Sequence, residues 1–350
     1  MNNDVTRAVV PLLLMVSGGS DSTALLELAA LLAVGEEPQG PAGRKLAVMM
    51  ADALPQNACF ELGVLHVNHL LRGVDSDADE AFVAQRCEEL GVPCATHRVD
   101  IAALAATSAD GMEAVARTER YRLAVQELAA LEARSCAKPA SGLILTAHTL
   151  DDRVETFLMR TLVGTGPGGL GSIPRRRGSI VRPLLDATRQ ELRDFVAEQH
   201  PGLPASALWR DDATNDDGSN FRSQVRTRFV PVMRSLKPGF EASLARTMDL
   251  IAEEDVARAD AAASIAYRNL AFDGQIATLP AKVLLGIDVP LARRVIRQCL
   301  LVVNPDARLE SRQIERILEG VLARQPFATE VDSGIRVNGD GVALTMRLVR

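Results

Sequence analysis

The stretch from Leu12 to Leu32, LLLMVSGGSDSTALLELAALL, constrains the fold more than any other part of the chain. Leu12–Val16 is apolar like a buried strand, Ser17–Ser22 (SGGSDS) interrupts it, and apolar residues then recur at helical spacing. Two glycines permit positive φ, and the first N–H groups of the helix point into the same concavity. Because a helix N-terminus carries partial positive charge and free donors, we predict a phosphate site here. A plain strand-to-helix turn is the alternative.

The turn differs from two common nucleotide-binding loops. No Gly-Lys-Ser/Thr follows its glycines, which excludes the usual P-loop with its triphosphate lysine. The turn also lacks the dinucleotide fingerprint G-x-G-x-x-G. The arrangement Ser-Gly-Gly-x-Asp-Ser therefore favours phosphate binding of another kind.

Strand and helix patterns alternate through the first half of the chain. Further strands are expected at 62–67, 96–101, 143–147 and 179–185, helices at 79–90 and 113–133, a flexible insertion at 35–43, and a helix or loop at 45–57. Strands separated by helix-length segments pair in parallel, so we predict an α/β domain with a parallel five-stranded sheet and helices on both faces. Ligands of such sheets bind beyond the carboxyl ends of the strands. The polar strand ends at 17–19, 66–69 and 148–152 should therefore meet in one crevice.

The second half has helical patterns, followed by a small mixed region. Helices are expected at 191–199, 222–236 and 240–270, then at 290–302 and 311–320, with a terminal β-ribbon at 329–349. The long pattern at 240–270 has a weak apolar stripe, so we interpret it as a connecting arm. We predict a catalytic domain at 1–215, a helical arm at 216–270 and a small α+β substrate-binding domain at 271–350.

Composition limits the class of protein. A chain of 350 residues is long enough for two or three domains, and 47% hydrophobic with only 3% aromatic residues is typical of a soluble protein. The apolar start, Ala8–Val16, is too short for a membrane span and follows no basic leader, so we expect a cytoplasmic protein without membrane contact. Five scattered cysteines without a C-x-x-C disfavour disulfides, zinc and sulfur transfer.

The net charge of −6 conceals an asymmetry along the chain. Residues 1–159 hold 12 Lys/Arg against 22 Asp/Glu, whereas residues 160–240 hold 13 against 8. An acidic first part of the chain fits Mg-nucleotide chemistry, and a basic second part fits contact with a polyanion, although other arrangements fit these charges too.

The second strong motif is TAHTLDDRVET at 146–156. Asp152 and Glu155 are three residues apart on an opening helix, so their carboxylates face the same ligand, which we expect to be Mg²⁺ or an ammonium group. The alternative is that Asp151 and Asp152 only cap the helix and complement its dipole. The position directly after a strand that ends beside the glycine turn favours the first interpretation.

Four further segments carry charged or polar side chains that suit ligand binding. Glu113 and Arg117 form either a surface pair or a phosphate contact. The loop GTGPGGLG at 164–171, with Arg175, Arg176 and Arg177 after it, is predicted to be a mobile lid or an RNA-facing loop. Arg222, Arg226 and Arg228 invite phosphate contact or form a solvated helix face. We interpret His66 and His69 as polar lining of the crevice, because a zinc pair would need further ligands nearby.

Taken together, the motifs resemble the tRNA(Ile)-lysidine synthase family, a branch of the PP-loop N-type ATP pyrophosphatases. The matching segments, in the family's order, are SGGSDS (17–22), HVNHLLRG (66–73), GMEAVARTERY (111–121), TAHTLDDRVET (146–156), RTLVGTGPGGLGS (160–172), RPLLDATRQEL (182–192) and DDATNDDGSNFRSQVR (211–226). They cover most of residues 12–235, and the region after Ala271 matches far more weakly. Ser223 departs from the family's usual asparagine.

The resemblance implies a Rossmann-like sheet of the adenine nucleotide alpha hydrolase type and a ligase that forms a C–N bond. ATP would adenylate the C2 oxygen of the wobble cytidine, position 34, in the isoleucine tRNA with anticodon CAU. L-lysine would then attack C2 and form lysidine, with pyrophosphate and AMP released. ATP is thus expected as substrate, with Mg²⁺ as cofactor.

The resemblance also implies roles for individual residues of this chain. ATP would be bound by Ser17, Gly18, Gly19, Ser20, Asp21, Ser22 and His148, with Asp21 as the Mg²⁺ ligand. The catalytic set would be Asp21, Arg117, Asp152 and Glu155, with Asp152 and Glu155 binding the lysine amine. Contacts to tRNA phosphates would come from Arg175, Arg176, Arg177, Arg222 and Arg226.

Two other functions remain open at this point. Another PP-loop enzyme, such as a tRNA thiolase or an amidating synthetase, is disfavoured because cysteine pairs and a preceding glutaminase domain are absent from the sequence. A non-catalytic nucleotide-sensing or tRNA-binding module would bind ATP without producing pyrophosphate.

Overall fold

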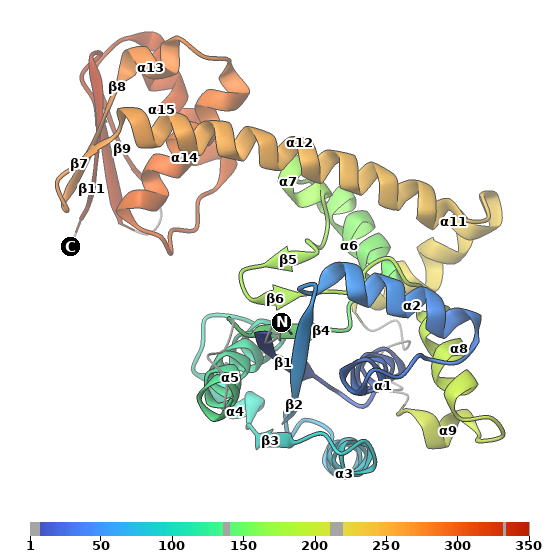
Figure 1. The fold of residues 1–350 in the computed structure, drawn as a ribbon. Helices are drawn as coiled ribbons and strands as arrows, with labels where there is room; N and C mark the ends of the chain where they lie inside the picture. The colour runs from blue at the N-terminus through green and yellow to red at the C-terminus, as the bar shows by residue number, and fades with distance from the viewer. Residues whose placement is uncertain (1–7, 136–140, 211–219, 332–333, 350) are drawn as a thin grey trace, which may run out of the picture. The chain divides into compact units, whose positions relative to one another are not determined.

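The computed structural model describes residues 8–135, 141–210, 220–331 and 334–349 (Figure 1). The chain divides into two compact units, Met1–Asp249 and Leu250–Arg350. Each unit has its own sheet. The three-part division expected from the sequence stays a prediction.

The first unit contains a six-stranded sheet in the order β3-β2-β1-β4-β6-β5. Its strands are β1 (Ala8–Met15), β2 (Ala58–Asn68), β3 (Cys94–Arg98), β4 (Leu143–Thr146), β5 (Arg176–Arg177) and β6 (Ile180–Val181). All neighbours pair in parallel except β5 and β6, which form an antiparallel edge. The predicted α/β fold with a mostly parallel sheet is confirmed, with six strands in place of five because the short β5 adds an antiparallel edge.

Helices cover both faces of this sheet. The helices of this part of the chain are α1 (Ser20–Val34), α2 (Gly40–Ala53), α3 (Val74–Glu89), α4 (Ile101–Ala106), α5 (Met112–Arg134), α8 (Arg189–Gln199) and α9 (Ala205–Leu208). Alternate residues of β1 point to opposite faces: Leu12 and Leu14 pack in the core with α1, α2 and α8, whereas Leu13 packs against α5. Figure 1 shows α5 and α1 on opposite sides of the strands.

Three local expectations differ from the structure. Helix α2 begins at Gly40, inside the predicted flexible insertion, with Pro41 in its first turn and Leu46 and Met50 in the core. The short helix α4 was not expected. The predicted mobile segment 164–171 contains the helix α7 (Pro167–Leu170), and Arg160 donates to the carbonyls of Gly169 and Ser172 at 2.8 and 2.9 Å. Those bonds fix the segment against the neighbouring helix.

A helical layer completes the first unit. It consists of α6 (Leu150–Val163), α10 (Phe221–Gln224), a π-helical turn at Val225–Phe229, α11 (Val230–Leu236) and the start of α12 (Phe240–Asn269). Its small core joins Leu150, Val154 and Leu158 of α6 to Val225 and Met248. This packing brings the segment after residue 219 against the start of α6.

The second unit is a five-stranded antiparallel sheet with helices. Its strands run in the order β7-β8-β11-β10-β9 and, with the helices, are β7 (Ala271–Phe272), β8 (Ile276–Pro280), β9 (Phe327–Val331), β10 (Ile335–Gly339), β11 (Ala343–Leu348), α13 (Ala281–Leu285), α14 (Val289–Val303) and α15 (Ser311–Ala323). The core is formed by Val295 and Ile317 on the helices and by Leu279, Val337 and Leu344 on the strands, among others. The terminal ribbon and both helices expected from the sequence are present.

No helix in the described parts of the chain combines the length and the apolar character of a membrane span.

Candidate functional site

The glycine turn forms as the sequence predicts. Gly18 adopts φ +92°, a conformation open to glycine, and a Cβ on Gly19 would find its nearest neighbours at 3.8 Å and beyond. Gly19 is the N-cap of α1 and offers no side-chain oxygen to the N–H groups of the first turn. These donors, together with the positive end of the helix dipole, make the turn suitable for an anion.

Hydroxyl groups hold the turn in shape. The Ser22 hydroxyl accepts from the Ser17 N–H at 3.2 Å and donates to the Gly19 carbonyl at 3.0 Å. The Thr23 hydroxyl donates to the Gly18 carbonyl at 3.3 Å, and the Arg210 N–H donates to the same oxygen at 2.9 Å. The conformation of the turn is therefore set within the protein, before a ligand is present.

The strand ends converge as expected. Met15, the last residue of β1, lies opposite Thr146, the last residue of β4, and opposite Leu65 of β2, which continues to Asn68. The ring of His66 is buried, with Nδ1 2.9 Å from the Val16 carbonyl. His148 follows β4, with Nδ1 2.9 Å from the Thr146 hydroxyl. The predicted crevice therefore lies at the carboxyl edge of the sheet.

Asp152 serves both as a helix cap and as a side chain of the crevice. Its Oδ2 accepts from the Thr149 N–H at 2.9 Å, and its own N–H donates to the Thr149 hydroxyl at 3.3 Å, which makes a reciprocal capping box. The other oxygen, Oδ1, accepts from Arg222 at 2.8 Å. The capping role weighed from the sequence is therefore present at Oδ2, whereas binding of a ligand by Oδ1 stays a prediction.

The acid pair binds guanidinium groups. Arg222 donates from Nη2 to Asp152 at 2.8 Å and from Nε to Glu155 at 2.7 Å, so a single cation spans both carboxylates. Arg226 donates to both oxygens of Glu155, at 2.7 and 3.0 Å. The Glu155 side chain is only 2% exposed. In the free protein the two acids thus share a guanidinium of the chain itself, and their binding of Mg²⁺ or an ammonium group stays a prediction.

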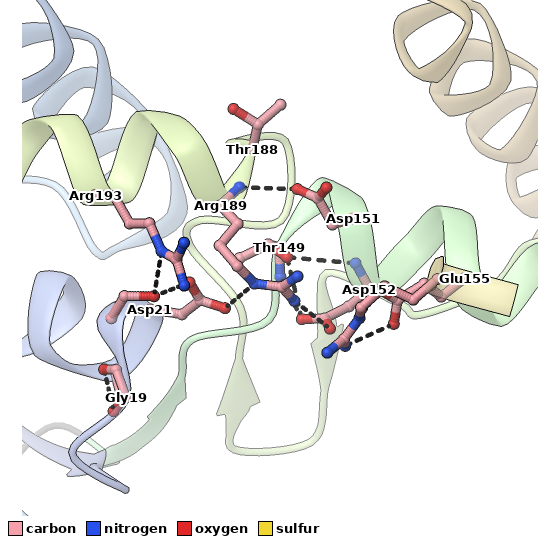
Figure 2. Close-up of polar contacts among 12 residues, drawn as sticks. Gly19, Asp21, Thr149, Asp151, Asp152, Glu155, Thr188, Arg189 and Arg193 are labelled. Carbon is pink, nitrogen blue, oxygen red and sulfur yellow. Dashed lines mark hydrogen bonds and ion pairs between the residues drawn. The ribbon is translucent and has the colours of Figure 1, made fainter. Parts of the chain in front are cut away.

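Arg189 connects the acid pair to the glycine turn, as Figure 2 shows. Its Nε donates to Asp21 at 3.2 Å, its Nη2 lies 3.6 Å from Asp152, and its main-chain N–H donates to Asp151 at 2.8 Å. One turn further along α8, Arg193 donates to the Ser20 hydroxyl at 3.3 Å. The first turns of α1, α6 and α8 are therefore joined through side chains around one crevice.

The charges in the crevice shift several pKa values. Burial raises the pKa of the Asp21 carboxyl, and Asp152 adds to the rise while Arg189 opposes it. Burial also acts to raise the pKa of Asp152, but Arg222, His148 and the Thr149 N–H outweigh it and hold this pKa below its ordinary value. Burial, supported by nearby arginines, lowers the pKa of His148 to about 4. At neutral pH the ring of His148 is therefore neutral.

Two cavities lie near the acid pair and its arginines. One, of about 140 Å³, is polar and is lined by Asp151, Val154, Glu155, Arg189, Arg226, Val230, Arg234 and Glu241. The other, of about 230 Å³, is lined by Glu113, Thr156, Met159, Arg160, Asn220, Phe221 and Arg222. Glu155 thus lines the first cavity, and Arg222, which donates to Glu155, lines the second.

Carboxylate oxygens are the ligands that Mg²⁺ prefers, and it commonly takes one or two of them together with substrate phosphates. The Asp21 carboxylate fits this requirement, because it lies in the first turn of α1, directly after the glycine turn. Within the described residues, no group of three His, Cys, Asp or Glu side chains is arranged to hold a metal.

Other residues predicted for the site lie in different surroundings. Arg175 forms ion pairs with Asp186 and Asp249 and so stabilises the fold. Arg176 and Arg177 are exposed on β5, and Arg117 lies 5.0 Å from the ring centroid of Tyr121. Residues 211–219 of the last motif lie outside the described residues. Ser223, the position that departs from the family, is buried, and its N–H donates to Asn220 at 2.8 Å.

Sequence reasoning missed Arg189 and Arg193. Both lie on the helix that follows the fifth expected strand, directly after Thr188, which caps that helix through a capping box with Glu191. The N-terminus of a helix after a parallel strand faces the same crevice as the other strand ends. That position was the signal that could have identified them.

Comparison with known proteins agrees with this geometry. A PP-loop domain model matches residues 3–233. The chain is 35% identical over 302 residues to the tRNA(Ile)-lysidine synthase of Thermus thermophilus, covering 85% of this chain and 50% of that protein. It is 36% identical to the tRNA(Ile)-lysidine synthase of Chlorobaculum tepidum, and the match covers 63% of this chain and 56% of that protein. It is also 36% identical to that of Deinococcus radiodurans, and this match covers 69% of this chain and 34% of that protein. The chain spans about half the length or less of these three curated relatives.

The family model covers most of the first unit, including the glycine turn, the acid pair and α8. The loop that the sequence set apart from P-loops and dinucleotide folds is therefore the PP-loop itself, and the chain belongs to the PP-loop family of ATP-utilising proteins.

Proposed function

We propose that the protein ligates L-lysine to C2 of the wobble cytidine of the CAU-anticodon isoleucine tRNA, with ATP as the activating substrate. The cytidine O2 attacks the α-phosphorus of ATP and pyrophosphate leaves. The ε-amine of lysine then attacks C2, and AMP leaves with the former O2. The names of the relatives and the PP-loop support this choice. The observation that carries it is the single guanidinium held by both Asp152 and Glu155.

The PP-loop provides for the first step. The N–H groups of the first turn of α1 would hold the departing diphosphate, since fixed donors stabilise charge that develops on a leaving group. Asp21 would hold Mg²⁺, which neutralises phosphate charge when bound. Arg189 lies close enough to Asp21 and Asp152 to maintain the spacing of these two carboxylates in the free protein.

The acid pair provides for the second step. A lysine ε-ammonium carries one positive charge and three donors, so it can replace the guanidinium N–H groups that Asp152 and Glu155 accept in the free protein. The low pKa of Asp152 keeps this carboxylate ionised and suits it to binding the cation. Binding of the amine would release Arg222, whose guanidinium then becomes available to a phosphate.

The acceptor base must leave its stack for either step. An anticodon loop presents an unpaired base at little cost, and single-stranded RNA is the usual target of base-specific recognition. The cavity lined by Phe221 and Arg222 offers an aromatic edge, and Arg222 donates to both members of the acid pair. It would receive part of the acceptor nucleotide.

The test is to incubate the protein with ATP, lysine and unmodified tRNA transcript, omit each in turn, and measure pyrophosphate and AMP. We expect pyrophosphate only where ATP and tRNA are both present, without continuing turnover when lysine is omitted, and AMP only in the complete mixture. Asp21→Asn should lower pyrophosphate release by roughly 100-fold or more. The matched control Asp194→Asn lies on α8, where Asp194 accepts from Gln190, and should leave the rate unchanged. Pyrophosphate formed without tRNA, or AMP formed without lysine, would contradict the proposal.

A further inference from the structure

The arginines near the crevice fall into two groups. Arg189, Arg222 and Arg226 are paired with carboxylates. In the part of the chain that the structure describes, Arg117, Arg120 and Arg182 form no ion pair with a carboxylate. A set of cations gathered without counter-charges needs an anion from elsewhere. We call Arg117, Arg120 and Arg182 the unpaired arginine cluster.

Arg182 is the buried member of the cluster. It follows β6, is only 4% exposed, and donates from Nη1 to the Pro174 carbonyl at 2.7 Å. Tyr121 lies close enough to act on the charge of Arg182, and within the described residues the buried Arg182 Nε has no hydrogen-bond partner. A buried charged donor without a partner is costly, so it suits a partner from outside the chain, such as an ion or a ligand.

The other members lie on α5. Arg117, Arg120 and Tyr121 are three and four residues apart, so they share one helix face. Arg117 packs over the Tyr121 ring at 5.0 Å, and Tyr121 is also close enough to act on the charge of Arg182. Both arginines of α5 are exposed and free to reach a ligand. Tyr121 thus connects an accessible pair of cations to a buried one.

The electrostatics agree with this arrangement. Arg117 is close enough to Arg120 for the two charges to repel, whereas Tyr121 and Glu113 act in the opposite direction. Burial and Arg120 lower the pKa of His69 to about 4, and its buried Nδ1 has no hydrogen-bond partner among the described residues. Mutual repulsion among cations shows that this part of the crevice has an excess of positive charge.

We propose that the unpaired arginine cluster, with His69 beside it, is a subsite for a backbone phosphate of the RNA substrate, next to the acceptor nucleotide. This inference rests on the proposed function. A phosphodiester carries one negative charge and two free oxygens, which suit two arginines at different depths. The cluster also continues to the surface through Arg177 of β5, which acts on Arg182. A positive strip that extends outward suits a polymer better than the phosphates of ATP, for which the PP-loop already provides donors.

The experiment uses Arg120→Gln in the full chain, because Arg120 is exposed and its replacement leaves the core intact. The matched control is Arg122→Gln on the same helix, since Arg122 is paired with Glu119 at 2.8 Å. Binding of unmodified tRNA transcript is measured at several salt concentrations, and binding of ATP is measured separately. Arg120→Gln should reduce the slope of log K against log salt by about 1 and weaken RNA binding severalfold. ATP affinity should not change.

The other outcomes are distinct. Equal salt slopes for Arg120→Gln and Arg122→Gln would overturn the proposed subsite. A loss of ATP affinity in Arg120→Gln with normal RNA binding would also overturn it, because the cluster would then bind the nucleotide. Failure of the unaltered protein to bind tRNA would instead contradict the proposed function. Arg182→Lys keeps the charge but removes the planar fork, so it should weaken RNA binding with a smaller change in slope.

Discussion

Replacing Glu155 by glutamine tests the ion network of the crevice directly. The Glu155 carboxylate accepts three hydrogen bonds, one from Arg222 and two from Arg226, and its side chain is 2% exposed. Glutamine has nearly the same shape but only one acceptor oxygen. Its NH₂ group would face a guanidinium N–H, so at least one charge-assisted bond becomes a contact between two donors.

The size of the effect follows from the exposure of the partners. Removing one member of a buried ion pair costs about 3–5 kcal/mol. The side chains of Arg222 and Arg226 are 37% and 21% exposed, so water compensates part of their lost charge. We therefore expect Glu155→Gln to destabilise the first unit by about 2 kcal/mol. In a unit of this length, that corresponds to a fall of roughly 4–8 °C in its Tm.

The assay is differential scanning calorimetry of the full chain, with Glu119→Gln as the control. Glu119 pairs with Arg122 on the surface of α5, and such a pair contributes only about 0.2–0.5 kcal/mol. The control should therefore shift the Tm by about 1 °C. Equal shifts for the two variants would refute the reasoning, because Glu155 would then contribute no more than a surface ion pair.

Three further predictions concern other positions. Gly18→Ala places a side chain at φ +92° where phosphate must approach, so ATP binding measured by calorimetry should fall at least tenfold, whereas Gly91→Ala, at φ +66° in open space, should leave it intact. Burial and a nearby arginine hold the pKa of His69 at about 4, so below about pH 6.5 the unfolded chain binds a proton at this residue that the folded chain does not bind. The free energy of unfolding therefore falls as the pH drops from about 6.5 to 4. In urea unfolding at pH 5, His69→Gln should raise the free energy of unfolding by up to about 2 kcal/mol. A Cβ on Gly339 would lie 2.2 Å from the Phe327 ring, so Gly339→Ala should cost about 1–3 kcal/mol and lower the Tm of the second unit, and an unchanged thermogram would contradict this.

The parts of the site that lie within short segments were predictable from the sequence. The PP-loop combines a buried strand, two glycines and a helix start, and Asp152 and Glu155 are spaced for one helix face. The partners of those acids were not predictable in the same way. Arg222 lies 67 residues after Glu155 and reaches it only because α10 packs on α6. From the sequence, the charge of Arg222 was as compatible with a phosphate contact as with an ion pair to Glu155.

The errors in the fold have a similar origin. A helix that starts at Gly40 contradicts local propensity, because glycine and proline favour loops, yet Leu46 and Met50 find a place in the core and their burial stabilises the helix. The glycine-rich segment at 164–171 lacks a local reason for order. Arg160, on the preceding helix, supplies the donors that hold it.

The divided carboxylate of Asp152 has a consequence for any attempt to dissect this protein. One of its oxygens caps the first turn of α6, and the other accepts from Arg222 and, under the proposed function, would bind the lysine amine. Loss of activity in an Asp152 variant would therefore not distinguish a lost amine contact from a displaced start of α6. Glu155 accepts from arginines and not from the first turn of α6, so its variants leave that start intact, and their cost in stability can be measured separately by calorimetry.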